Sequence, residues 1–291
     1  MKHRLKSKIS IICAVCLLFC IAVGFAGAYA VNETEYDEPD FDAAEIPLYI
    51  NGIKVADGVK VFDTTYVSLR AFVEFVGEQT DIAWDEETST VTVTCEGLEL
   101  NATSGSTYLS ANGRCFYIPY GILNINGSIS VPVREIAKVF SVDIEWDEEN
   151  SSVSICADEP SIIEGGDDFY NLDDLYWLAR LINAESGNQP MDGKIAVGNV
   201  VINRVEDPSC PDSIYSVIFD KRYGVQFSVT ETGGIYAEPN DESLIAAKIC
   251  LEGYNIVDEC IYFVNPEIGA YSWFMQNRVY VATIGEHDFY A

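Results

Sequence analysis

One carboxylate, Glu185, occurs in a stretch of sequence that is otherwise apolar at helical spacing. Leu178 and Ile182 precede it by seven and three residues, so a helix would place all three on one face. Desolvation on such a face raises the pKa of a carboxyl toward the range in which it donates a proton near neutral pH. We therefore predict that Glu185 is a general acid of the kind that glycosidic cleavage requires. The alternative is a structural glutamate that caps the helix or pairs with Arg180 or Arg204.

Three helices are predicted to position this carboxylate. The first begins at the capping residue Asn171 and ends near Ser186. Residues 193–205 are too apolar for a surface helix, so this second helix is predicted to pack on the first. A third, amphipathic helix is predicted over residues 241–253.

Two asparagines of the second helix, Asn199 and Asn203, lie four residues apart on one helical face. Their amides could hydrogen-bond a carboxyl or hold a sugar amide. The alternative for Asn203 is that it closes the end of the helix together with Arg204.

The composition argues against two classes of protein. The chain has 46 Asp and Glu against 17 Lys and Arg, a formal net charge of -29, whereas nucleic-acid binders that neutralise phosphates need a surplus of bases. It has two histidines and no HExxH motif, so the His-rich sites of zinc amidases and zinc peptidases are not expected. We expect no nucleic-acid partner, no metal and no cofactor.

Residues 1–30 have the pattern of a secretory signal peptide. Basic residues precede an apolar run from Ile9 to Phe25, and Ala28-Tyr29-Ala30 supplies a small-x-small cleavage site. The alternative is an uncleaved membrane anchor, because the apolar run is nearly long enough to span a bilayer. Cleavage would leave His287 as the only histidine. Either way, the remainder of the chain is expected outside the cell.

Six cysteines follow the predicted signal peptide, and their pairing is not determined by the sequence. An even number permits disulfides outside the cell, but six cysteines allow fifteen connectivities. Cys250 and Cys260 are close enough in sequence to bridge the end of a helix to the following strand, which is the one pairing we consider. The six cysteines are Cys95, Cys115, Cys156, Cys210, Cys250 and Cys260.

An internal repeat divides the rest of the chain. Residues 46–157 hold two copies of a strand, a short helix and a two-stranded hairpin, with an Arg, a Trp and an Asp in the same order in each. The acidic residues 31–45 are interpreted as a solvated spacer and residues 158–169 as a linker. Residues 170–291 then form the second domain.

The repeated segment resembles the copper amine oxidase N-terminal-like domain of secreted bacterial proteins. The resemblance lies in Arg70 with Trp84-Asp85 and in Arg134 with Trp146-Asp147, each set within a V-x-[LV]-R, helix and W-D unit. No copper is implied, because the segment has no histidine. For Trp84 and Trp146 we expect core packing, with carbohydrate stacking as the alternative. We interpret the domain as an accessory or targeting module that contacts cell-wall polymers.

From about residue 172 onward, six motifs occur in the order found in the SleB-type cell wall hydrolases, the spore-cortex-lytic enzyme family. The motifs are residues 178–185, 193–197, 200–205, 226–228, 262–266 and 284–290. The resemblance implies a mainly helical, lysozyme-like domain whose catalytic Glu is Glu185. It also assigns Gln226, Ser228, Tyr262, Asn265 and His287 to the site or the substrate groove; the alternative for His287 is a structural hydrogen bond. Gln189 stands where many members have a second Glu.

The sequence therefore predicts an α+β protein, in which a duplicated small α/β repeat domain precedes the mainly helical domain. The resemblance implies a secreted peptidoglycan lytic transglycosylase that acts on glycan strands, at the cell wall or the spore. It would cleave the bond between N-acetylmuramic acid and N-acetylglucosamine and leave a 1,6-anhydro end. The alternative is a non-catalytic wall-binding or spore-coat protein with a degenerate hydrolase domain.

Overall fold

The computed structural model describes residues 41–77, 79–157, 160–267 and 275–291. The predicted signal peptide and residues 31–40 of the predicted spacer lie outside these ranges. Within the described ranges, no helix combines the length and the apolar character needed to cross a membrane.

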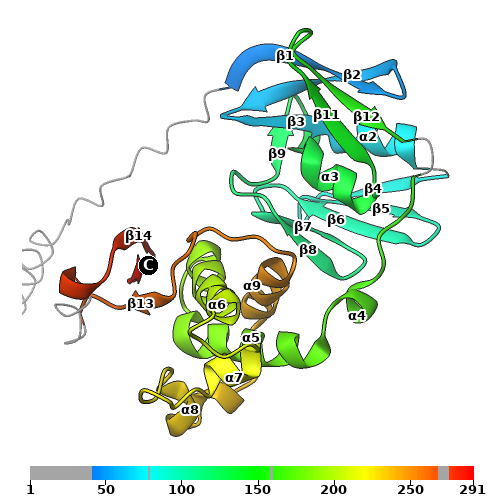
Figure 1. Cartoon of the computed structure of the whole chain (residues 1–291). Coiled ribbons are helices and arrows are strands. Elements are labelled where there is room, and N and C mark those ends of the chain that lie inside the picture. The colour runs from blue at the N-terminus through cyan, green and yellow to red at the C-terminus, as the bar shows by residue number, and fades with distance from the viewer. Residues whose placement is uncertain (1–40, 78, 158–159, 268–274) are drawn as a thin grey trace, which may run out of the picture. The chain divides into compact units, whose positions relative to one another are not determined.

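The first half of the described chain consists of two sheets and two short helices (Figure 1). The seven-stranded sheet contains, from edge to edge, β11 (Asp143–Asp147), β12 (Ser152–Cys156), β1 (Phe41–Ile50), β2 (Ile53–Val61), β3 (Thr64–Ser68), β10 (Ser128–Pro132) and β9 (Leu123–Ile125). The five-stranded sheet contains β4 (Asp81–Asp85), β5 (Thr90–Cys95), β6 (Leu98–Thr103), β7 (Tyr108–Ala111) and β8 (Arg114–Tyr117) in chain order. The helices are α2 (Leu69–Val76) and α3 (Val133–Val139). Strand β1 begins inside the segment that the sequence suggested as a spacer.

Both copies of the repeat have the predicted order of elements. Strand β3 leads into α2 and the β4–β5 hairpin, and β10 leads into α3 and the β11–β12 hairpin. The register is the same in both hairpins, because Trp84 is opposite Val91 and Trp146 is opposite Val153. The hairpins nevertheless join different sheets. Strand β5 continues into β6, whereas β12 pairs in parallel with β1 at the start of the domain.

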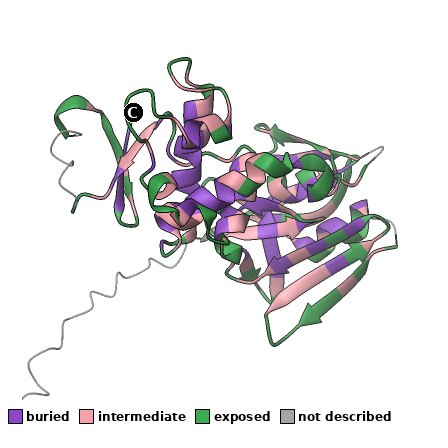
Figure 2. Cartoon of the chain, turned by 90° about the horizontal axis from the view of Figure 1, so that it is seen from below, coloured by how far each residue is buried: buried purple, intermediate pink, exposed green. Residues whose placement is uncertain are grey.

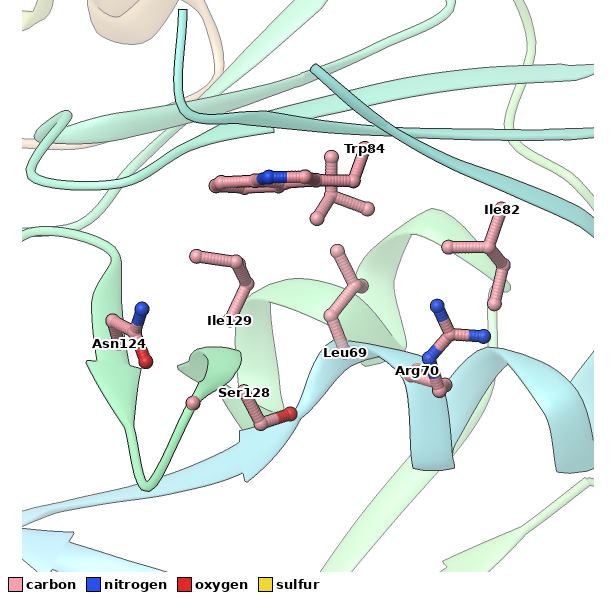
Figure 3. A pocket seen from close by; sticks show the side chains of 9 residues that line it. Leu69, Arg70, Ile82, Trp84, Asn124, Ser128 and Ile129 are labelled. Carbon is pink, nitrogen blue, oxygen red and sulfur yellow. The ribbon is translucent and has the colours of Figure 1, made fainter. Parts of the chain in front are cut away.

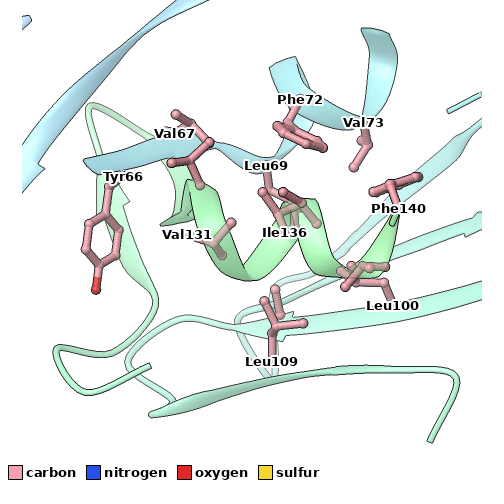
Figure 4. Close-up of a cluster of buried hydrophobic side chains, with 14 of the residues drawn as sticks. Tyr66, Val67, Leu69, Phe72, Val73, Leu100, Leu109, Val131, Ile136 and Phe140 are labelled. Atoms are coloured by element: carbon pink, nitrogen blue, oxygen red, sulfur yellow. The ribbon is translucent and has the colours of Figure 1, made fainter. Parts of the chain in front are cut away.

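The core of this region collects apolar side chains from both helices and both sheets. Phe72 of α2 and Phe140 after α3 pack with their ring centres 5.9 Å apart, above Leu100 and Leu109 of the five-stranded sheet (Figure 4). The two repeat tryptophans are not buried in it: Trp84 is 49% exposed and Trp146 is 46% exposed. The core-packing interpretation of these tryptophans is therefore wrong.

The second half of the chain is helical and ends in a small sheet. Its helices are α4 (Gly166–Phe169), α5 (Leu172–Ser186), α6 (Met191–Glu206), α7 (Ile214–Ile218), α8 (Val229–Thr232), the 3₁₀ helix η1 (Gly234–Tyr236) and α9 (Asp241–Leu251). The strands β13 (Tyr262–Val264), β15 (His287–Tyr290) and β14 (Tyr280–Ile284) form the antiparallel sheet in that order. The α+β prediction is confirmed, as are the three predicted helices; α4 lies in the segment interpreted as a linker.

Helix α6 is the centre of this second half. It packs against α5 and α9 on one side and contacts β13 and β14 on the other (Figure 1). Most of its residues are buried, which Figure 2 shows as the purple colour along the helices of this region. The prediction of a buried second helix is thus confirmed, and α6 links the helix that carries Glu185 to the small sheet that carries Tyr262 and His287.

Candidate active site

Glu185 lies in the last turn of α5, and the helix is built as its sequence predicts. The side chain of Asn171 caps it by accepting hydrogen bonds from the backbone N–H groups of Asp173 at 3.0 Å and Asp174 at 3.2 Å. Glu185 itself is half-buried, and burial raises the pKa of its carboxyl above the ordinary value. This is the electrostatic state that a general acid requires.

No partner offsets this burial within the described part of the chain. The side chain of Glu185 makes no hydrogen bond and no ion pair there. Arg180 donates instead to Glu238 at 2.5 Å, and Arg204 donates from Nε to the carbonyl oxygen of Ile261 at 2.7 Å. Neither arginine therefore pairs with Glu185, which removes that form of the structural alternative.

The backbone after Glu185 is held from several directions. The side-chain amide of Asn240 donates to the carbonyl oxygen of Gly187 at 3.2 Å. Lys194, which is 1% exposed, donates from Nζ to the carbonyl oxygen of Gln189 and to Glu242 at 2.8 Å. These bonds hold the connection from α5 to α6, which directly follows Glu185.

Gln189 connects this segment to the small sheet. Its Oε1 accepts a hydrogen bond from the backbone N–H of Glu286 at 2.9 Å, in the turn between β14 and β15. Gly285 in this turn has a φ of +61°, and a Cβ there would lie 2.3 Å from Oε1 of Gln189. The bond needs only the oxygen, so Gln in place of Glu keeps the acceptor and removes a negative charge near Glu286.

A second cluster surrounds Tyr262 of β13. Arg278 donates to its hydroxyl at 2.9 Å, with the guanidinium 4.5 Å from the centre of the Tyr262 ring. Arg204 lies 5.6 Å from the same ring and donates to Oε1 of Gln226 at 3.4 Å. Burial lowers the pKa of Arg204 below the usual arginine value. The structure thus brings Gln226 and Tyr262 together around Arg204.

His287 is 8% exposed and packs edge-on against Phe263, with the ring centres 5.2 Å apart. Burial lowers its pKa, which favours the neutral imidazole. Its Nδ1 is buried and has no hydrogen-bond partner among the described residues. A hydrogen bond through Nδ1 is therefore not what holds this side chain; ring packing surrounds it.

The other two predicted site residues lie apart from these contacts. Ser228 is exposed at the start of α8, and its side chain does not cap that helix. Asn265 closes its own turn, because its Oδ1 accepts from the backbone N–H of Glu267 at 2.9 Å.

Asn199 and Asn203 have structural roles. Asn199 donates to the carbonyl oxygen of Tyr254 at 2.7 Å and accepts from the backbone N–H of Ile256 at 3.0 Å. Asn203 donates to the carbonyl oxygens of Asp258 and Cys260 at 2.7 and 2.8 Å. The prediction that they hold a carboxyl or a sugar amide is wrong; their amides satisfy the backbone of the loop between α9 and β13.

Cys250 and Cys260 are unbridged thiols, so the pairing considered from the sequence is wrong. Cys250 is buried against α6, where its thiol donates to the carbonyl oxygen of Ile195 at 3.4 Å. Cys260 lies in a separate buried cluster with Val200 and Phe289, and burial raises its pKa to about 11. The two side chains thus serve different parts of the core.

Two residues that support this region, Arg204 and Lys194, were not assigned such a role from the sequence. Gln189 was singled out there, but its bond to the β14–β15 turn was not predicted. The signal in the sequence that could have revealed Arg204 and Lys194 was a cation inside an apolar helix, since such a cation is rarely buried without a partner.

No group of three or more His, Cys, Asp and Glu side chains in the described ranges is arranged to hold a metal ion.

Comparison with known proteins identifies both halves of the chain. Residues 188–290 match the family described as Cell Wall Hydrolase. The chain carries a cell wall hydrolase domain at its C-terminal end. Residues 49–155 match the Copper amine oxidase N-terminal domain, which precedes the hydrolase domain as the sequence predicted. The hydrolase match begins three residues after Glu185, so it does not itself include this carboxylate.

The similar proteins of known name resemble the hydrolase domain. The spore cortex-lytic enzyme of Bacillus subtilis is 28% identical over 120 residues, which cover 41% of this chain and 38% of the relative. That of Bacillus cereus is 30% identical over 120 residues, covering 41% of this chain and 45% of the relative. The chain thus spans less than half the length of these relatives.

Two solved structures are also similar in sequence. The catalytic domain of the germination-specific lytic transglycosylase SleB from Bacillus anthracis is 29% identical; the match covers 44% of this chain and all of that chain, with a TM-score of 0.39. The catalytic domain of the Bacillus cereus SleB protein is 30% identical, with 42% and 92% covered and a TM-score of 0.38.

Proposed function

We propose that the hydrolase domain is a peptidoglycan lytic transglycosylase and that Glu185 is its acid/base. The observation that carries this proposal is the state of Glu185, a half-buried carboxyl with a raised pKa and no partner among the described residues. A structural carboxylate in this position would have found a cation or a set of N–H donors. The names of the similar proteins support a cell-wall glycan as the substrate.

The proposed reaction needs one carboxyl. Protonated Glu185 gives its proton to the oxygen that joins N-acetylmuramic acid to N-acetylglucosamine, and the C1–O bond breaks as positive charge develops at C1. The C6 hydroxyl of the same muramic acid residue then attacks C1, and the carboxylate of Glu185 takes its proton. Glu185 ends protonated as it began, and the product carries a 1,6-anhydro ring. No water is consumed, because the nucleophile belongs to the substrate.

In this proposal the predicted groove residues have different roles: some contact the sugar and others support the site. Gln226 and Tyr262 lie around Arg204 and can present an amide and a phenol to sugar hydroxyls. Ser228 is exposed and Asn265 is half-buried, so both are accessible to a long glycan strand. His287 is buried and packs against Phe263, so its role in the proposal is to hold the small sheet together. The Gln189 bond holds that sheet against the end of the Glu185 helix.

The site of action belongs to the same proposal. We place the enzyme outside the cell, at the cell wall or the spore cortex, after removal of the predicted signal peptide. The predicted domain limits of residues 46–157 and 170–291 are kept, with the repeat domain as the accessory module.

The test is digestion of purified peptidoglycan by the wild-type protein, with mass analysis of the soluble products. We expect the turbidity to fall and the new muramic ends to be one water lighter than hydrolysed ends. Hydrolysed ends alone would overturn the transglycosylase mechanism. Binding to the sacculi with constant turbidity would instead establish the non-catalytic wall-binding alternative.

A further inference from the structure

The repeat domain contains a pocket far along the chain from Glu185. A cavity of about 220 Å³ lies between β4, the edge strand of the five-stranded sheet, and β9, the edge strand of the seven-stranded sheet, beside the first residues of α2 (Figure 3). It is lined by Leu69, Arg70, Ile82, Trp84, Val91, Asn124, Gly127, Ser128 and Ile129. Five of these residues come from the first copy of the repeat, and the other four come from the β9–β10 hairpin, whose second strand begins the second copy.

The walls of the pocket are apolar and its ends are polar. The flat face of the Trp84 indole is turned toward Leu69 and Ile129 on the opposite side, as Figure 3 shows. Arg70 and Asn124 lie at the two ends of the same view. A flat ligand placed between the walls would therefore meet carbon on both faces and hydrogen-bonding groups around its edge.

The charge of the pocket is close to neutral. Arg70 is paired with Glu74 of the next helical turn at 3.3 Å, and both are exposed. Ser128 shares a hydrogen bond of 2.8 Å with Ser68, so its hydroxyl is held in place at the rim. Because the whole chain has a net charge of -29, a polyanion would be repelled, and the paired arginine does not reverse this.

We propose that this pocket binds one β-linked glucopyranose-type ring of a neutral glycan, with the N-acetylglucosamine of peptidoglycan as the biological ligand. In such a ring the hydroxyl groups are equatorial and the C–H bonds are axial, so both faces are apolar and the perimeter is polar. This is the pattern of the pocket walls and ends. The volume is below the roughly 300–1,000 Å³ of pockets for drug-sized ligands, which suits a single sugar ring. Peptidoglycan as the source of the ring rests on the proposed function.

The second copy of the repeat supplies a matched control. Trp146 occupies the same hairpin position and is 46% exposed, against 49% for Trp84. It lines neither the Trp84 pocket nor the open depression beside β11 and β12. The hairpin of β9 and β10 closes the pocket only on the side of Trp84. The two substitutions thus remove nearly equal exposed surface, but only Trp84→Ala removes a wall of the pocket.

The experiment measures binding of the full chain to insoluble peptidoglycan stripped of anionic polymers. All proteins carry Glu185→Gln to limit digestion, and a β-1,4-linked N-acetylglucosamine tetramer serves as competitor. We expect Trp84→Ala to weaken binding about tenfold, the value of a lost stacking partner. Low concentrations of the tetramer should displace the reference protein from peptidoglycan, and they should no longer displace Trp84→Ala. Trp146→Ala should stay within about twofold of the reference. Equal binding by the two variants, or an unchanged Trp84→Ala, would overturn the proposal.

A second variant covers the case in which Trp84→Ala lowers folding stability. Asn124→Ala removes an exposed amide from the end of the pocket and should weaken binding several-fold without changing thermal unfolding. Unchanged binding of this variant alongside an unfolded Trp84→Ala would also overturn the pocket. Release of anhydro ends is measured separately, in proteins with Glu185 intact. If the proposed function is wrong, cleavage is absent while binding still depends on Trp84. If the pocket is wrong, cleavage occurs and binding does not depend on Trp84.

Discussion

Two glutamates of the helical half of the chain are both withdrawn from water, but their surroundings differ. Glu252, just after α9, has a side chain that is 4% exposed and accepts from Nε and Nη2 of Arg114 at 2.8 and 2.7 Å. It also accepts from the hydroxyl of Tyr170 at 2.6 Å. Glu185, at the end of α5, has none of these contacts within the described residues, and its pKa is raised.

The difference supports the proposal that Glu252 is a structural carboxylate and Glu185 a reactive one. Around Glu252 the loss of water is offset by a bidentate arginine and a phenol, which ties the helical half of the chain to β8. Around Glu185 the loss of water is not offset, so the carboxyl holds its proton more readily and is prepared to transfer it. Burial alone therefore does not mark an acid/base; we propose Glu185 for this role because its burial is not compensated within the described residues.

The largest predicted effect is the loss of activity in Glu185→Gln. General acid catalysis by a positioned carboxyl contributes about 10²- to 10⁴-fold, so turnover should fall by at least about a hundredfold. Stability should not fall, because the substitution removes a desolvated acid and no bond within the described residues. Glu231→Gln, at an exposed glutamate of the same domain, is the control and should keep full activity. Rates from peptidoglycan digestion and melting curves of all three proteins give both readouts.

The opposite pattern is predicted for Glu252→Gln. Breaking a buried ion pair leaves an uncompensated charge on Arg114 and costs about 3–5 kcal/mol. Tm should therefore fall by roughly 10 °C. Turnover measured well below the new Tm should remain near the wild-type value. An unchanged Tm of Glu252→Gln, or the loss of its turnover at temperatures well below its Tm, would contradict the division between the two carboxylates.

The pH dependence provides a third contrast. The folded-state pKa of Glu185 is raised, so its contribution to stability is present below the unfolded pKa and is lost as the pH rises through the folded value. Relative to the wild type, Glu185→Gln should thus gain free energy of unfolding as the pH rises from acidic to neutral. Urea unfolding at several pH values measures this difference. The rate of glycan cleavage by the wild type should also fall as the pH rises, because the carboxyl of Glu185 loses the proton that it donates. A difference that does not change with pH would contradict the raised pKa.

The smallest predicted effects concern Gln189. Gln189→Ala removes the acceptor for the backbone N–H of Glu286, which should cost about 1 kcal/mol and reduce turnover several-fold through the loosened β14–β15 turn. Gln189→Glu keeps an oxygen acceptor and should stay closer to the wild type in both measurements. Similar losses in both variants would show that the oxygen is not what the position requires.

The sequence predicted those parts of the molecule that depend on neighbouring residues. Asn171 indicates the start of α5, and the apolar residues that follow predict that Glu185 lies on the inner face of this helix. The repeated Arg and Trp predict both hairpins. These signals are periodic or local, so they can be recognised without knowledge of the fold.

Contacts between distant segments could not be predicted in this way. The partner of Gln189 lies 97 residues away, and Arg204 reaches a carbonyl group 57 residues further along the chain. Nothing local to the two hairpins indicates that one joins β6 and the other joins β1, because this depends on the chain that follows each of them. The exposure of Trp84 likewise results from the edge position of β4.

Mass analysis of the products released by wild type, Glu185→Gln and Glu231→Gln tests the central claim most directly. The account predicts that the wild type and Glu231→Gln release glycan fragments with muramic ends one water lighter than hydrolysed ends. It predicts that folded Glu185→Gln releases almost none. Release of the same anhydro ends at the wild-type rate by Glu185→Gln would contradict the assignment of Glu185 as the acid/base.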